Sequence, residues 1–222
     1  SILAIVFIPL FHTPCQANQN PDTSATNIAE EVQFHVDTAL KLMQSWDNTG
    51  AIVHWEKAAE RCKEAGLWRE YIQLKSAVSH CYHLLGQCDK TLENDKSILP
   101  VALKHLGEID SSIAQIYSSI ANAYSCLAEY DKSLEHFEKE LEIRLVVHGP
   151  YHKTVGVIYS NKSTHYQNTG DIETAIDYAE KALEVAQQNP DKNYENLAQA
   201  HFNFASVSGD MGKSYVAIDH YE

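Results

Sequence analysis

Apolar residues recur at helical spacing along most of the chain, in segments that short polar turns separate. The clearest example is the stretch 154–185, where Val155 and Ile158 fall on one helical face. Gly170 supplies a residue that can take positive φ where a first helix must stop. Asp171 offers a carboxylate to the free N–H groups of a second helix. The pattern therefore predicts an antiparallel helix hairpin, with apolar surface that needs neighbouring hairpins to cover it.

The same pattern returns at a fixed interval of 42 residues. Four small residues each end a first helix of a hairpin, and each lies 42 positions after the one before: Gly86, Ala128, Gly170 and Gly212. Five residues after each of them stands another small residue: Thr91, Ser133, Ala175 and Ala217. A constant register over most of the chain is the mark of a stacked structural repeat. The fold class predicted is all-α, and no strand is expected between residues 30 and 222.

The predicted helices follow from this register. They are expected near residues 28–45, 50–65, 68–85, 89–106, 110–127, 131–147, 152–169, 172–188, 193–210 and 213–222. Residues 28–222 then form a repeat array of about five hairpins, with the last one cut short at Glu222. Pro100 falls inside a predicted helix, where a kink is expected because proline lacks the N–H group.

The residues of the clearest hairpin resemble the tetratricopeptide repeat. Tyr166, Gly170, Ala175, Ala182 and Leu183 match that family's pattern as they stand. The usual repeat has 34 residues, whereas the period of 42 is similar to the variant of kinesin light chains. The resemblance covers roughly residues 30–222 and implies a right-handed superhelical solenoid of antiparallel helix pairs. Two departures from the pattern are Lys162, where the family usually has Leu, and Glu140, where it has Ala.

The amino-terminal segment has a different character. Residues 2–11 are an uncharged apolar run, and small residues that suit cleavage follow it up to Ala17. Residues 1–17 are therefore predicted to be a secretory signal that lacks its charged start, and residues 18–27 a linker. Such a protein would be exported to the periplasm or outside the cell, with no membrane span in the mature chain. Two alternatives are a lipid anchor on Cys15 and an apolar segment packed on the repeats of a cytoplasmic protein.

The charge and the motifs limit the possible functions. A net charge of −13 argues against nucleic acid or an anionic membrane as the main partner, because both need a basic surface. No phosphate loop, nucleophile elbow or HExxH motif occurs, so the visible segment is not predicted to be an enzyme and no cofactor is expected. His80 and His83 share a helical face near Cys88, but three ligands on two helices make a weak metal candidate, and no metal is predicted. The sequence predicts no oligomeric state.

Cysteines and tryptophans are interpreted as structural. Four cysteines would remain after signal cleavage, and they are expected to be mostly buried thiols: Cys62, Cys81, Cys88 and Cys126. Three tryptophans fall near the first hairpin, where they suggest an aromatic end-plate or, as the alternative, a pocket for a hydrophobic ligand: Trp46, Trp55 and Trp68.

The resemblance implies a ligand groove lined by the first helix of each hairpin. The matching positions are polar with one exception: Gln73, Ser76, His80, Gln115, Ser118, Ser119, Asn122, Ser160, Asn161, Thr164, Gln199, Phe202, Asn203 and Ser206. None is Lys or Arg, so a clamp for carboxylates is not expected and binding should depend only weakly on salt. Asn161 and Asn203 are 42 residues apart, with Ser119 at the same place one repeat earlier. These side chains could bond an extended peptide backbone or, alternatively, their own helices.

Two functions are consistent with these observations. The favoured one is a non-catalytic scaffold that binds a peptide or protein segment in the groove. The alternative is a regulatory or sensor arm of a larger signalling or protease-like protein, whose effector domain would lie beyond Glu222.

Overall fold

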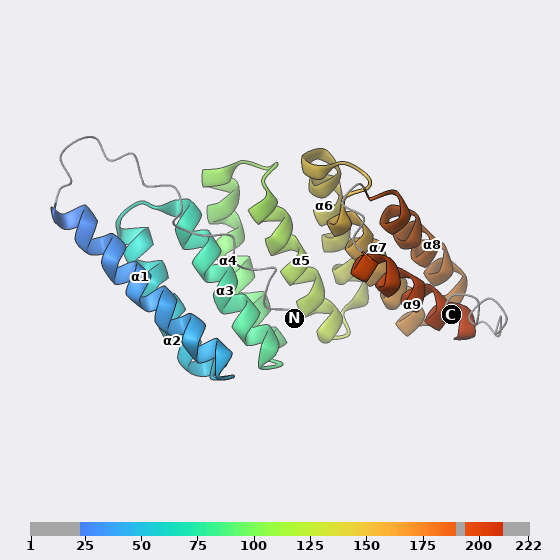
Figure 1. The fold of residues 1–222 in the computed structure, drawn as a ribbon, viewed down its shortest axis with the longest axis horizontal. Helices are drawn as coiled ribbons and strands as arrows, with labels where there is room; N and C mark the ends of the chain where they lie inside the picture. The colour runs from blue at the N-terminus through green and yellow to red at the C-terminus, as the bar shows by residue number, and fades with distance from the viewer. Residues whose placement is uncertain (1–22, 190–193, 211–222) are drawn as a thin grey trace. The chain divides into compact units, whose positions relative to one another are not determined.

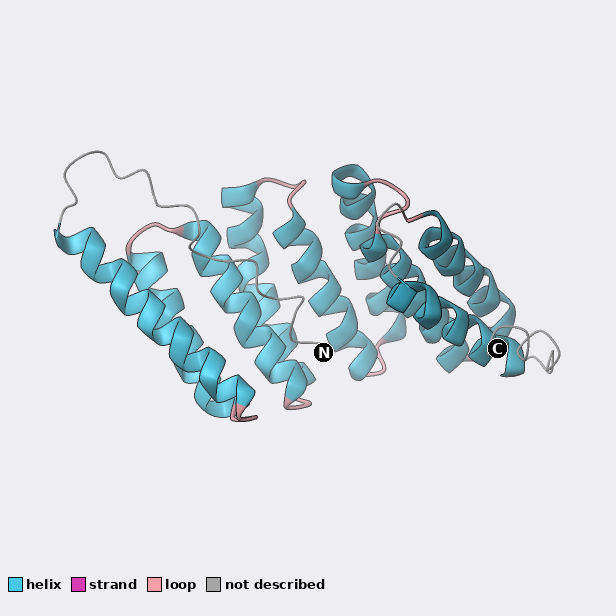
Figure 2. Cartoon of the chain, viewed as in Figure 1, coloured by secondary structure: helices cyan, strands magenta, loops and turns pink. Residues whose placement is uncertain are grey.

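The computed structural model describes residues 23–189 and 194–210, and all regular structure within these ranges is helical (Figures 1 and 2). The helices are α1 (Thr23–Gln44), α2 (Asn48–Glu64), α3 (Trp68–Leu84), α4 (Cys88–Leu106), α5 (Ser111–Cys126), α6 (Tyr130–His148), α7 (Lys153–Thr169), α8 (Ile172–Gln188) and α9 (Tyr194–Asp210). The all-α prediction is confirmed. The predicted helix 213–222 and the signal segment 1–17 lie outside the described residues. Residues 23–27, predicted as part of the linker, belong to α1.

The chain divides into two compact units, Ser1–His105 and Leu106–Glu222. In the first unit α2 packs between α1 and α3. Their core contains Val32, Trp55 and Val78, all at most 2% exposed. In the second unit α5 pairs with α6 and α7 with α8, while α9 packs mainly on α8. Phe137 and Ile158 belong to one core cluster there, which joins the two hairpins.

The 42-residue register has a direct structural counterpart where the two helices of a hairpin cross. In α3–α4, the Thr91 hydroxyl lies 3.4 Å from the carbonyl oxygen of Ser79. In α5–α6, the Ser133 hydroxyl donates to the Ala121 carbonyl oxygen over 2.8 Å, and in α7–α8 Ser163 donates to Ala175 over 2.7 Å. Each pair is separated by 12 residues. A small residue at these sites thus permits close backbone approach and a buried hydroxyl bond between the helices.

The turns inside the hairpins also follow the register. Gly86 and Gly170 take φ of 68° and 86° where α3 and α7 end. Ala128 takes φ of 58° at the equivalent place after α5, a conformation that costs a non-glycine residue free energy. The Asp171 carboxylate accepts from the Thr174 N–H over 3.2 Å, as predicted for the start of α8. α4 continues through Pro100 as one helix.

Two structural interpretations need correction. Cys62 and Cys81 are buried free thiols as expected, but Cys88 and Cys126 are not free thiols, and Cys126 is exposed.

The tryptophans do not form an end-plate. Trp55 is 1% exposed inside the first core, whereas Trp46 is 80% exposed and Trp68 stacks on His105 at 4.3 Å between ring centroids. Sequence proximity could not separate these environments because each depends on which helical face meets a neighbour.

Candidate functional site

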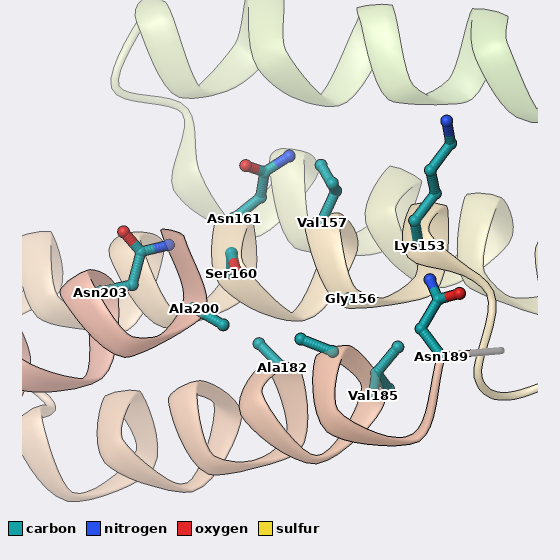
Figure 3. Close-up of a pocket in the computed structure, with 11 residues that line it drawn as sticks. Lys153, Gly156, Val157, Ser160, Asn161, Ala182, Val185, Asn189, Ala200 and Asn203 are labelled. Carbon is teal, nitrogen blue, oxygen red and sulfur yellow. The ribbon is translucent and has the colours of Figure 1, made fainter. Parts of the chain in front are cut away.

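An open pocket with a volume of about 220 Å³ lies in the second unit, among α7, α8 and α9 (Figure 3). The lining residues come from all three helices and from the end of α8: Lys153, Gly156, Val157, Ser160, Asn161, Ala182, Val185, Ala186, Asn189, Ala200 and Asn203. Its volume suits one apolar side chain together with a short stretch of extended backbone.

Small side chains create this pocket. Ala182 of α8 and Ala200 of α9 are almost fully buried and line the pocket. Because each has only a methyl group as its side chain, the space that a larger side chain would fill stays open. Gly156 brings α7 close to α8, since a Cβ atom there would lie 3.3 Å from Cγ1 of Val185. The result is a floor of glycine, alanine and valine atoms beneath a rim of polar groups.

Asn161 is the best-placed polar group on the rim. Its side chain is half-buried, lines the pocket and makes no hydrogen bond within the part of the chain that the structure describes. Figure 3 shows Asn161 on α7 and Asn203 on the neighbouring helix α9, both at the same end of the pocket. The amide therefore offers one acceptor and two donor positions to a ligand.

The pocket unites three of the predicted groove residues: Ser160, Asn161 and Asn203. The other described residues predicted on α7 and α9 are not among its lining residues. Thr164 is exposed and its hydroxyl donates to the carbonyl oxygen of Ser160 over 3.1 Å, within its own helix. On α9, Phe202 is 55% exposed and Ser206 half-buried, while the side chain of Gln199 lies outside the described residues.

Two predicted groove residues on α5 contact a buried ion pair of their own hairpin. Glu140 and Arg144 of α6 are 4% and 7% exposed, with Arg144 Nε 3.6 Å from Glu140 Oε1. Ser118 hydrogen-bonds to Glu140, and Arg144 Nη2 donates to Gln115 Oε1 over 3.4 Å. Burial raises the pKa of Glu140 to about 7, although Arg144 and Ser118 oppose this shift. Gln115 and Ser118 thus have internal partners.

The other predicted positions do not join this pocket. Ser119 and Asn122 are half-buried on α5 and are not among its lining residues. Gln73, Ser76 and His80 belong to α3 in the first unit. The Ser76 hydroxyl donates to the carbonyl oxygen of Ile72 over 3.0 Å, and burial lowers the pKa of His80.

Among the lining residues that the sequence analysis missed, Lys153 is the charged one. It is the first residue of α7, and with Val157 and Asn161 it forms a stripe at i, i+4 and i+8. The helical register from Asn161 was the available signal, but the resemblance did not include that position. A cation therefore does line the pocket, contrary to the argument from the fourteen predicted positions.

Two other site types were sought among the described residues. These residues contain no group of three or more His, Cys, Asp or Glu side chains placed to hold a metal ion. None of the described helices combines the length and the apolar character needed to cross a membrane.

Comparisons with known proteins identify the repeat. Two family models described as tetratricopeptide repeat match, one over residues 113–152 and one over residues 154–222. Comparison with curated proteins gives no significant match.

Several solved structures share the fold at low sequence identity. A putative kinesin light chain from Podosopora anserina with nearly identical TPR-like repeats has a TM-score of 0.72 and 13% identity, over 85% of this chain and 90% of that chain. BtubC (BKLC) from P. vanneervenii has a TM-score of 0.64 and 18% identity, over 90% of this chain and 89% of that one.

A Rap protein complexed with competence and sporulation factor is also similar. Its TM-score is 0.70 at 18% identity, and the match covers 91% of this chain but only 58% of the Rap chain. At these identities the structural matches show the fold alone. The two family matches show that residues 113–152 and 154–222 are tetratricopeptide repeats, in the same 42-residue register as Gly86, so the chain is a tetratricopeptide-repeat protein.

Proposed function

We propose that this protein is a non-catalytic interaction scaffold that binds an extended peptide segment in the pocket formed by α7, α8 and α9. Arrays of this family generally act as scaffolds rather than enzymes, and the similar Rap structure is a complex with competence and sporulation factor. These comparisons support a protein or peptide as partner, and the choice of pocket rests on the side chains that line it.

The observation that carries the proposal is the free amide of Asn161 at the rim of an apolar pocket. An internal role would require hydrogen bonds from this side chain to its own or a neighbouring helix, and the described residues supply none. An extended peptide has both a donor and an acceptor on each residue and can satisfy the amide. Each such bond contributes on the order of 0.5–1.5 kcal/mol.

The floor of the pocket adds an apolar contribution to binding. Burial of one Val or Leu side chain over Ala182 and Ala200 contributes on the order of 1.5–3 kcal/mol. With one or two backbone hydrogen bonds and the entropy lost on association, affinity in the high micromolar to millimolar range is expected for a short peptide. A longer segment would gain further contacts.

The test uses a mixture of acetylated, C-terminally amidated hexapeptides with Val fixed at the third position. Binding to the full chain is followed by NMR, through the backbone amide signals of residues on α7 and α9. Asn161→Ala should weaken binding several-fold and leave the melting temperature unchanged. Asn168→Ala is the matched control, because Asn168 is exposed on the same helix and does not line the pocket.

Two results would contradict the proposal. One is the absence of shifts around the pocket at millimolar peptide. The other is a loss of stability in Asn161→Ala with unchanged affinity per folded molecule, which would make the amide structural.

A further inference from the structure

Lys153 differs from most of the cations around it because its charge is not neutralised. Lys132 and Lys139 of α6 form ion pairs with Glu129 and Glu135, and Lys162 of α7 pairs with Glu138. Lys153 is exposed, and the described part of the chain provides its ammonium group with no ion pair or hydrogen bond. In a protein with a net charge of −13, a solvated cation on a pocket rim is an exception to the general charge pattern.

The pocket itself provides no opposite charge. Among the described residues that line it, Lys153 is the one charged side chain, and the polar remainder are asparagines and a serine. Figure 3 shows the Lys153 side chain near one end of the rim, where the Asn189 amide also lies, and the Asn161 and Asn203 amides toward the other end. A ligand that lies along α7 meets these two kinds of group in turn.

The helix fixes the separation between the two ends. Lys153 and Asn161 are eight residues apart on α7, which corresponds to about 12 Å along the helix axis. An extended chain advances about 3.3 Å per residue, so three to four ligand residues separate a group bound at Asn161 from one bound at Lys153. Val157, 53% exposed, lies between them.

From this arrangement we propose that the bound segment carries a carboxylate, which Lys153 holds, three to four residues from the backbone groups that Asn161 and Asn203 bind. The inference rests on the proposed peptide-binding function and adds the ligand's charge and the position of that charge. A single flexible ammonium group acts as a point charge and accepts either a side-chain carboxylate or the C-terminal carboxylate of a peptide. It is not the two-pronged clamp that the sequence analysis excluded.

The contribution of this contact should be modest and sensitive to salt. An exposed ion pair with good access to water increases affinity by about two- to fivefold at low ionic strength. Because the Debye length is about 10 Å at 0.1 M salt and shorter above it, most of this gain should disappear at 0.5 M. Binding that depends only on the amides and the apolar floor would keep its affinity.

The experiment extends the hexapeptide mixtures with fixed Val to three forms. The first has Asp at both ends and an amidated C-terminus, the second has Asn at both ends and a free C-terminal carboxylate, and the third has Asn at both ends and an amidated C-terminus. Affinities are measured by NMR for the wild type, for Lys153→Gln and for Lys132→Gln, which removes the same charge on α6 outside the pocket.

The wild type and Lys132→Gln should prefer at least one carboxylate-bearing form over the neutral form by about two- to fivefold, and Lys153→Gln should bind all forms equally. Preference for the Asp form would identify a side-chain carboxylate as the source, and preference for the free-acid form a terminal one. Equal binding of the three forms by the wild type, with the effect of Asn161→Ala intact, would overturn the role of Lys153 but keep the pocket. A preference that survives in Lys153→Gln would also overturn it. Absence of binding by every form would overturn the proposed function and this inference together.

Discussion

The buried lysine of α7 leads to the sharpest stability prediction. Lys162 stands where the family usually has Leu, and its side chain is 2% exposed. Its Nζ lies 4.4 Å from the ring centroid of Tyr178 and forms an ion pair with Glu138 of α6, whose side chain is 53% exposed. Burial alone would lower the pKa of Lys162, but hydrogen bonds to Glu138 and Tyr178 hold this pKa above its usual value. Glu138 therefore compensates for the burial of the charge.

Glu138→Gln should remove that compensation and leave the ammonium group buried. Loss of one partner of a fully buried pair costs about 3–5 kcal/mol. Because half of Glu138 is in contact with water, a smaller loss of about 1.5–3 kcal/mol is expected, in line with hydrogen bonds to charged groups. For a chain of this size, that corresponds to a decrease in melting temperature of about 3–12 °C.

The control is Glu135→Gln. Glu135 pairs with Lys139 on the exposed surface of the same helix, so its replacement should leave the denaturation midpoint nearly unchanged. Lys162→Leu, which restores the family's residue, should stay within about 1 kcal/mol of the wild type because the buried charge is removed, while Glu138 remains in contact with water and needs no partner. Urea denaturation followed by circular dichroism measures all three. Equal losses for Glu138→Gln and Glu135→Gln would refute the reasoning.

Three further predictions concern the second unit. Leu183→Ala should destabilise by about 2–5 kcal/mol because Leu183 is 9% exposed, while Glu173→Ala on the solvated face should change stability by less than about 0.5 kcal/mol; similar denaturation midpoints would contradict this. Ala128→Gly should raise stability by about 0.5–1 kcal/mol because it relieves a positive φ, and thermal melts that show a loss would disprove it. Glu140 binds its proton more tightly in the folded state, so its contribution to stability should fall by about 3 kcal/mol as pH rises from 4.5 through 7, and level off only above the folded pKa of about 7; Glu140→Gln should remove that part of the pH dependence of unfolding.

The sequence by itself determined the local structure. Helix bounds agree with the prediction to within two residues for every described helix except α1, which begins earlier because its first turn is polar and shows no apolar period. The positions of Gly86, Ala128 and Gly170 at helix ends and the Asp171 cap were also correct. Each of these features depends on backbone preferences and side chains within a few residues, and a 42-residue register repeats the same local information several times.

The tertiary structure decided which polar residues have partners inside the protein. Gln115 and Ser118 were predicted as groove residues by the same rule as Asn161, yet they contact Arg144 and Glu140, whereas the Asn161 amide stays open to the pocket. Glu140, which replaces the family's Ala, gives Ser118 an internal partner, and Arg144 of the same helix gives one to Gln115. No local pattern in α5 encodes that change, because the partner lies more than twenty residues away in the sequence.

The pocket and its cation were likewise decided by packing. The space exists because Gly156, Ala182 and Ala200, from three different helices, leave the same volume unfilled. Lys153 belongs to the site because it lies on the same face of α7 as Asn161, two helical turns earlier, and that face lines the pocket. A sequence specifies the size and polarity of each side chain. A cavity, however, forms only where small side chains from several helices lie next to one another, and the packing of those helices determines whether they do.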